Sequence, residues 1–344
     1  MQQSIEISSK VKIKIFGDTH SERIGILLTG FPKDFAVDFK QVDKALQRRK
    51  STSVFTTPRK EPDKYIIVSG FKGKKTTGEV IEVYFENTNT ASKDYTQFSL
   101  TPRPGQADFI SLQKYGQTFP GGGLFSGRTT ILFVFIGEII RQYLGLEFSS
   151  EIIQIGTEKN PLKFVEYLNQ IKAEQDSVGV KITTTLTGLK PGVGSVFFNK
   201  LNSNIARFLY LIPGLKALGF GLGSETVNKK GSEYNDALAD LSGKTRTNNA
   251  GGIVGGISNG NPILIETTFR PTGSISKPQE TLNLKTGKIE LIEIQGRHDI
   301  CFGLRAPVIV EAMTALAVFA TIEGDKNDQN SRWYDGWRPW YIWK

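Results

Sequence analysis

Apolar side chains recur along this chain with two periods, one near two residues and one near three and a half. Strict alternation over residues 11–15 is typical of a strand with one buried face. Alternation or a short apolar run predicts further strands over 24–28, 65–68, 80–85, 180–186 and 262–269. Helical spacing predicts helices over 39–49, 129–143, 162–172, 201–211 and 307–322. Strands and helices therefore alternate without a clear linker.

Local signals support some of these boundaries. Asp38 is a suitable N-cap for the helix over 39–49, and Pro307 lies in the first turn of the last helix. Two long helices are each opened by a segment with glycine and arginine, namely Gly127-Arg128 and Gly303-Leu304-Arg305. This recurrence indicates two related halves.

Composition excludes several classes of protein. The 344 residues are 38% apolar and 22% charged, as in soluble, folded proteins. The longest apolar run, Ile131–Gly137, is far shorter than the roughly 20 residues of a membrane span, and the first six residues show no signal pattern. The single cysteine, Cys301, rules out an intramolecular disulfide, and with only two histidines it argues against a zinc site. We expect a cytoplasmic protein with no metal and no membrane partner.

The net charge requires an explanation. Lys and Arg number 43 and Asp and Glu 34, which gives a formal charge of +9. Such a balance fits nucleic acid, an anionic membrane or small anionic ligands. A solvated surface with excess lysine is the simpler interpretation of any one basic cluster. No nucleic-acid-binding signature accompanies the clusters, so charge alone does not decide between these partners.

Polar, glycine-rich loops separate the predicted elements. They are Gly17–His20, Arg103–Gln106, Gly121–Gly123, Ala250–Gly256 and Gly296–Asp299. Glycine lets the backbone approach a ligand closely, and exposed N–H groups favour anions. Each loop alone could be a plain turn. Two of them hold the only histidines, His20 and His298, which favours a ligand site.

The last residues have an unusual composition. All four tryptophans fall within Trp333–Trp343, mixed with arginine and tyrosine. This segment would dock on the body of the protein, on a neighbouring subunit or on a membrane surface. A poorly ordered tail is the alternative, and the sequence does not separate them.

The loops, taken in this order, resemble the chorismate synthase family. Gly17-Asp18-Thr19-His20 is similar to the family's Gly-Glu-Ser-His-Gly signature. Further matching segments are Thr56–Asp63, Arg103–Asp108, Asp176–Gly179, Asn249–Gly260, Arg270–Thr272, Gly296–Asp299 and Glu311–Met313. The resemblance covers residues 10 to 320 or so, and the tryptophan-rich tail lies outside it.

The resemblance implies a mixed α+β fold, a β-α-β sandwich of two related halves. It implies a domain over residues 1–325 followed by the tail 326–344, a homotetramer, and reduced FMN as cofactor. The implied reaction is an anti-1,4-elimination in the shikimate pathway. In it, 5-enolpyruvylshikimate 3-phosphate loses phosphate and one ring hydrogen to give chorismate. Substrate and FMN each carry a phosphate worth about −1.5 to −2 charges, so the +9 has an explanation without nucleic acid.

The resemblance also implies roles for individual residues. His20 matches the general acid that protonates the leaving phosphate, and Asp299 matches an aspartate that relays a proton to or from the flavin. Arg48 matches an arginine that binds substrate or NADP, and Arg49 belongs to the same cluster. Positions that line the flavin are Ser126, Gly255, Arg270, Pro271, Thr272, Gly273, Ser274 and Arg297. A hydrogen-bonded loop histidine and a turn cap are the structural alternatives for His20 and Asp299.

The chain departs from the family pattern at several of these sites. Gln106 takes the place of a second catalytic histidine, and glutamine cannot carry a proton near neutral pH. Gln47, Val54 and either Leu124 or Phe125 replace basic residues, and Ser21 replaces a glycine. Two hypotheses follow. The chain is an FMN-dependent lyase with impaired or altered activity, or it is a non-catalytic paralogue that binds flavin or another anion.

Overall fold

The computed structural model describes residues 2–6, 11–50, 53–56, 62–87, 98–294 and 298–325. Three parts of the sequence discussed above lie outside these residues: Arg297, residues 57–61 of the matching segment Thr56–Asp63, and the tryptophan-rich tail.

The first sheet has five antiparallel strands in the spatial order β1-β2-β3-β7-β4. They are β1 (Gln2–Glu6), β2 (Lys12–Phe16), β3 (Arg23–Thr29), β4 (Tyr65–Ser69) and β7 (Ile81–Glu86). Alternate apolar residues such as Ile13, Ile24 and Ile26 are buried on one face. On the same two strands Phe16 pairs with Gly25, where a side chain would collide with the phenyl ring at 2.2 Å.

The second sheet repeats this arrangement with four antiparallel strands. They are β8 (Glu147–Ile155), β9 (Val180–Thr187), β10 (Leu215–Phe220) and β13 (Ile263–Phe269). The spatial order is β8-β9-β13-β10, which parallels β2-β3-β7-β4 in the first sheet. In the second sheet, and in the four matching strands of the first, the last strand along the chain lies between the second and the third.

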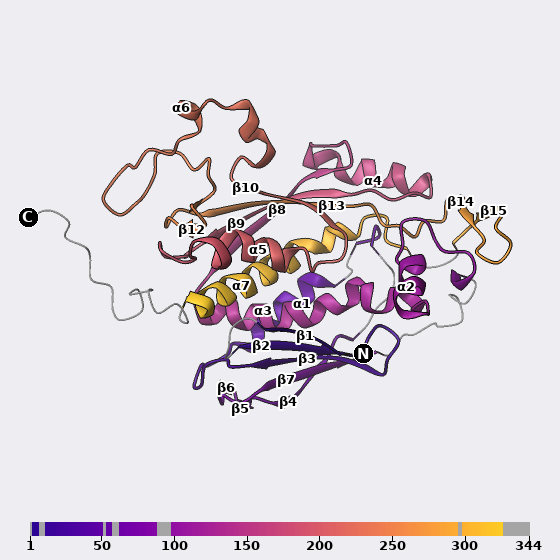
Figure 1. Cartoon of the computed structure of the whole chain (residues 1–344), viewed down its shortest axis with the longest axis horizontal. Helices are drawn as coiled ribbons and strands as arrows, with labels where there is room; N and C mark the ends of the chain where they lie inside the picture. Colours follow the sequence, from indigo (N-terminus) through magenta and orange to yellow (C-terminus); the bar gives the residue numbers. More distant parts are fainter. Residues whose placement is uncertain are drawn as a thin grey trace, which may run out of the picture.

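Four helices lie between the two sheets (Figure 1). They are α1 (Phe39–Arg49), α3 (Thr130–Leu144), α5 (Leu201–Leu209) and α7 (Ala306–Asp325). The segment Phe302–Asp325, which contains α7, is long and apolar enough to cross a membrane. Most of it is buried inside the protein, however, and its side chains join the same hydrophobic cluster as both sheets. We therefore interpret α7 as the central core helix of a mixed α+β fold.

The closest helix packing is between α3 and α7, at Gly137 and Ala312. A Cβ atom added to Gly137 would lie only 2.6 Å from both Cβ and O of Ala312. Because no side chain separates them here, the two helices can approach each other at backbone distance. The starts of both helices are thereby held in a defined relation, which matters for the site described below.

Shorter elements lie around this core. The hairpins are β5 (Phe71–Lys72) with β6 (Lys75–Thr76), β11 (Ile253–Val254) with β12 (Ile257–Ser258), and β14 (Gln279–Leu282) with β15 (Ile289–Ile292). The outer helices are α2 (Asp108–Tyr115), α4 (Phe164–Ala173) and α6 (Gly231–Tyr234). Short 3₁₀ turns η3 (Gly127–Thr129) and η7 (Phe302–Arg305) open α3 and α7. Figure 1 places α2 at one end of the long axis and β12 at the other.

The predicted helices and strands are present within a few residues of their expected bounds. The Asp38 cap is confirmed, since its Oδ1 accepts a hydrogen bond from Lys40 N at 3.0 Å. Of the strands in the two sheets, β1, β8 and β10 were missed, and so were the short hairpin strands around the core. Both β8 and β10 carry a register shift that breaks the alternation of side chains. The apolar stripe on α4 is only partly buried, because Leu168 packs inward while Val165 is 62% exposed.

We expect Gly137→Ala to lower the free energy of unfolding by about 1–3 kcal/mol, because the new methyl group must push α3 and α7 apart. Chemical denaturation measures this loss. Gly231→Ala is the matched control, since a Cβ atom there meets nothing within 4 Å. Equal stability of both variants would show that the helix contact is looser than described.

Candidate active site

His20 lies in the tight loop that joins β2 to β3. Asp18 closes the loop, its Oδ1 accepting hydrogen bonds from His20 N at 2.8 Å and Ser21 N at 3.0 Å. The Ser21 hydroxyl accepts from Asp18 N and reaches the carbonyls of Asp18 and Arg23. Gly17 has a positive φ of 78°, and a Cβ there would strike Arg23 O at 2.1 Å. Ser21, which departs from the family pattern, thus completes the internal hydrogen bonding of this loop.

Asn87 connects this loop to the interior. Its Nδ2 donates to Asp18 O at 2.9 Å and to Ser21 O at 2.8 Å, and its Oδ1 accepts from Arg128 Nε at 3.4 Å. Arg128 is buried in η3, at the start of α3, and its Nη2 also donates to Glu86 O. The His20 loop is therefore one side chain away from a buried arginine.

Arg128 and Arg49 share one carboxylate. Both guanidinium groups pair with Asp63, Arg128 at Oδ1 and Arg49 at Oδ2, the latter at 3.3 Å. All three side chains are buried. Arg49 comes from the end of α1 and Arg128 from the start of α3, so the fold rather than sequence proximity brings them together.

Arg305 brings a third positive charge, from the start of α7. Its Nη2 donates to both carboxylate oxygens of Asp299, at 2.9 and 3.0 Å. Burial, together with the nearby charges of Arg128 and Arg305, lowers the pKa of Arg49 to about 10 despite the attraction of Asp63. Arg49 remains a cation at neutral pH, but in an environment that opposes its charge.

We call Arg49, Asp63, Arg128, Asp299 and Arg305 the arginine cluster. Its ion pairs join three guanidinium groups to two carboxylates, which leaves an excess positive charge. The Nε atoms of Arg49 and Arg305 are buried and have no hydrogen-bond partner among the described residues. Buried donors and uncompensated positive charge are what a bound anion would satisfy.

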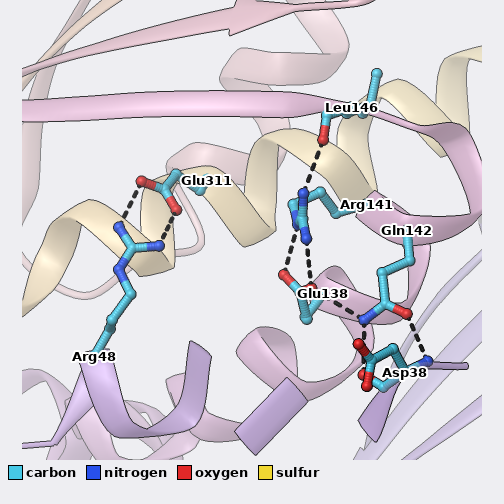
Figure 2. A network of polar contacts seen from close by, with 7 residues as sticks. All are labelled: Asp38, Arg48, Glu138, Arg141, Gln142, Leu146 and Glu311. Carbon is cyan, nitrogen blue, oxygen red and sulfur yellow. Dashed lines mark hydrogen bonds and ion pairs between the residues drawn. The ribbon is translucent and has the colours of Figure 1, made fainter. Parts of the chain in front are cut away.

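Arg48 faces a different neighbour, although it is adjacent to Arg49 in sequence. Its guanidinium forms two hydrogen bonds with Glu311 on α7, at 2.6 and 2.8 Å, and Figure 2 shows this fork beside the Arg141–Glu138 pair on α3. The bond to the buried Glu311 raises the pKa of Arg48. Consecutive helical residues point about 100° apart, which explains the divergence. Binding of substrate or NADP by Arg48 stays a prediction.

Gln106 contacts the segment that follows β13. Its Nε2 donates to Ser274 Oγ at 3.0 Å, and Arg103 Nη1 reaches the same hydroxyl at 3.3 Å. Arg103 is buried and fixed by two 2.8 Å bonds to Asp108 at the start of α2. The loop that carries Gln106 is thus held against residues 270–274.

Residues 270–274 have the properties of a ligand cradle. Arg270 Nη1 donates to Gly105 O at 2.8 Å. A Cβ atom at Gly273 would lie 3.0 Å from both Arg270 Nη1 and Gln106 Nε2. Glycine at this position therefore lets both side chains approach the backbone closely. Thr272 Oγ1 is buried without a partner among the described residues. The guanidinium of Arg270 suits the phosphate of FMN, and the hydroxyl of Thr272 and the nearby backbone suit its carbonyl-bearing ring. These residues therefore fit the implied cofactor.

The cradle and the arginine cluster adjoin each other through the segment Asp176–Gly179. Ser177 Oγ donates to Thr272 O at 2.7 Å, and the next residue, Val178, donates its N–H to Ile300 O at 2.9 Å. Ile300 directly follows Asp299 of the arginine cluster. Most of the sequence-predicted positions therefore belong to one continuous region.

Two predicted flavin positions are placed differently. Ser126 caps η3, its Oγ accepting from Arg128 N at 3.2 Å, so it borders the arginine cluster. Gly255 lies in the turn between β11 and β12. Figure 1 shows β12 at the opposite end of the long axis from α2, the helix that closely follows Gln106 in the chain. Within one chain, Gly255 is not brought to the other site residues.

Some candidate residues were missed by sequence reasoning. Arg128 and Arg305 were noted only as openers of long helices, Asp63 only as the end of a matching segment, and Asn87 not at all. The available signal was an arginine one or two residues after a glycine at a helix start, which suits an anion site. His298 has the local role expected of it, since its Nε2 lies 2.9 Å from Ile294 O. Burial raises the pKa of Cys301 to about 12, which removes it as a nucleophile.

Comparisons with known proteins concern the family and the fold of the chain. The family model for chorismate synthase matches residues 11–322. The chain is 41% identical over 316 residues to chorismate synthase from Chitinophaga pinensis, covering 89% of this chain and 93% of that protein. It is 36% identical over 343 residues to chorismate synthase from Methanobrevibacter smithii, covering 91% and 94%. A crystal structure of chorismate synthase superimposes with a TM-score of 0.69 at 21% identity, over 91% of each chain.

The structural similarity establishes the fold, while the identities and the match over most of the chain establish common descent. The protein belongs to the chorismate synthase family.

Proposed function

We propose that the chain is a carbon–oxygen lyase that converts 5-enolpyruvylshikimate 3-phosphate to chorismate in the shikimate pathway. The observation that carries this proposal is the arginine cluster, with its excess positive charge, beside the loop of His20. The substrate combines a phosphate with two carboxylates, and charge-assisted arginine bonds are the strongest way to bind such groups.

In this proposal the chain's residues bind the anion and move protons. Arg49, Arg128 and Arg305 hold the anionic groups of the substrate, and His20, as imidazolium, donates its proton to the oxygen of the leaving phosphate. The carbon–oxygen bond to phosphate and one ring carbon–hydrogen bond break, and a second ring double bond forms. Asp299, held by Arg305, is placed to accept the ring-derived proton after it leaves the substrate. Arg48 supplies a further cation for substrate or NADP.

Arg270–Ser274, Gln106, Ser126 and Arg297 would hold reduced FMN, which would supply transient electron transfer with no net oxidation. Arg270 donates to the Gly105 carbonyl and has no acidic partner among the described residues, so its positive charge would be available to the flavin's phosphate. Gln106 can hydrogen-bond to this cofactor through its amide but cannot exchange a proton with it, so we expect the histidine-dependent step to be slow.

The proposal extends to the organisation of the protein. We infer a cytoplasmic homotetramer with a domain over 1–325 and a separate tail over 326–344. A second copy would supply Gly255 to the flavin, since this glycine lies far from Gln106 in its own chain. We also infer that the fold is a sandwich of two related halves. The equal strand orders support this, as do the corresponding positions of Arg128 before α3 and Arg305 before α7.

A non-catalytic paralogue is the second candidate. It is favoured by Val54, whose side chain is 73% exposed where family members carry an arginine, and by the lack of a proton carrier at Gln106. Such a protein would bind FMN or phosphate without releasing phosphate from the substrate. Turnover decides between the two candidates.

Inorganic phosphate is expected to raise the melting temperature of the protein, because it binds the arginine cluster of the folded state only. Chloride at equal ionic strength should not. In Arg128→Met the phosphate-induced shift should be lost, whereas Arg141→Met, which removes an arginine paired elsewhere with Glu138, should retain it. Differential scanning calorimetry measures each shift against the variant's own melting temperature. A full shift in Arg128→Met would remove the arginine cluster as the anion site.

Anaerobic incubation with FMN, a reductant and 5-enolpyruvylshikimate 3-phosphate should release phosphate. His20→Ala should reduce that release by at least about 10²-fold while flavin binding persists, because the leaving group loses its proton donor. His298→Ala is the matched control and should retain turnover. Flavin binding without any phosphate release in the unmodified chain would favour the non-catalytic paralogue, and retained turnover in His20→Ala would exclude His20 as the acid.

Gln106→His should raise kcat by about 10-fold or more, because imidazole can exchange a proton where glutamine cannot. Gln106→Asn, which keeps an amide but shortens it, should give no gain. Steady-state kinetics under the same anaerobic conditions tests both. An unchanged kcat in Gln106→His, with flavin bound normally, would show that this position does not limit the proton transfer.

A further inference from the structure

Asn87 occupies the junction between the His20 loop and the arginine cluster. It directly follows β7, and its main-chain N–H donates to Glu22 O at 2.9 Å. Its side chain donates to Asp18 O and Ser21 O and accepts from Arg128 Nε. Every hydrogen-bonding group of this side chain is therefore used on one of these two parts of the site.

The chemistry of these partners requires an amide. The carbonyls of Asp18 and Ser21 can only accept a hydrogen bond, and a guanidinium can only donate one, so the orientation of the Asn87 amide is determined. A carboxylate could accept from Arg128 but could not donate to the loop. An ammonium could donate to the loop but could not accept from Arg128.

The contacts also separate two structural roles. The His20 loop is already closed by its own bonds through Asp18 and Ser21, so Asn87 is not needed to give the loop its conformation. Arg128 is held mainly by Asp63, and its bond to Asn87 is long at 3.4 Å. The β3–β7 pairing and the bond from Arg128 to Glu86 O already bring the two parts near each other. The Asn87 side chain adds the direct link between the loop and Arg128.

We propose that Asn87 is a positioning residue that keeps His20 in register with the anion bound by Arg128. The inference rests on the proposed role of His20 as the proton donor. A misplacement of about 1 Å in such a pair can cost about 10²-fold in rate, whereas anion affinity depends on the arginines and not on the loop. Loss of Asn87 should therefore reduce proton transfer and spare anion binding.

Histidine NMR tests this coupling with inorganic phosphate as the probe. The chain has only two histidines, so His298→Gln leaves the imidazole signal of His20 alone. Saturating phosphate should raise the titration midpoint of His20, because a nearby dianion favours the imidazolium. In Asn87→Ala and in the nearly isosteric Asn87→Asp, this shift should shrink to less than half. The affinity of Asn87→Ala for phosphate should stay within about threefold.

Turnover should follow the same pattern, with kcat of Asn87→Ala reduced by about 10- to 100-fold and KM changed by less than about threefold. Asn199→Ala is the matched control. Asn199 also donates two bonds, to Thr321 O and Asp325 Oδ1, and accepts one from Asn204, in the loop that contacts the end of α7. It should lower stability without changing the phosphate response of His20.

The outcomes are distinguishable. A phosphate-induced shift at His20 that survives in both Asn87 variants overturns this inference alone. No shift in the unmodified chain overturns the proposed role of His20, and the inference with it. A loss of phosphate affinity in Asn87→Ala as large as the loss of kcat would show that Asn87 holds Arg128 rather than the loop, which also overturns the inference.

Discussion

Placing three arginines, two of them buried, against only two aspartates is the constraint on which the site depends. A buried guanidinium is costly unless it is paired, and the depressed pKa of Arg49 records that cost. The excess charge comes from three helix termini in the core: Arg49 ends α1, and Arg128 and Arg305 lie in the turns that open α3 and α7. An anion from solution would complete the pairing, so the same imbalance that opposes stability in the empty protein favours binding.

The core packing determines where those arginines lie. The α3–α7 contact at Gly137 and Ala312 allows the two long helices to run together, and each begins with the arginine that it contributes. The two hydrogen bonds between Arg48 and Glu311 then join α1 to α7 next to Arg49. Hydrophobic packing and polar bridges thus act on the same three helices, and a change at the distant helix contact would be felt at the anion site.

The departures from the family pattern do not disrupt this framework. Ser21 replaces a glycine but satisfies backbone groups in the His20 loop, and Gln106 keeps a direct bond to Ser274. Val54 lies exposed and removes a cation without disturbing the buried core. The substitutions therefore affect the supply of protons and peripheral charge, while the ion pairs of the arginine cluster are present.

Much of the fold followed from the sequence. Helix 39–49 with its Asp38 cap, the strands near 11–15, 180–186 and 262–269, and the final helix were predicted because their side chains report burial through local periodicity. Strands β8 and β10 escaped because register shifts disturb that periodicity. The loop motifs also identified His20, Gln106 and the 270–274 segment, since glycine-rich loops carry a local chemical signature.

Only the tertiary structure decided which of these residues meet. Arg49 and Arg48 are neighbours in sequence, yet one turns to Asp63 and the other to Glu311, because a helix rotates by about 100° per residue. Arg128, Arg305 and Asn87 joined the site through contacts between segments far apart along the chain, which no local pattern encodes. Gly255, by contrast, matches a site motif, but it belongs to the β11–β12 turn, and β12 lies at the opposite end of the long axis from α2 (Figure 1). Sequence specified the chemistry of each loop, and long-range packing specified its partners.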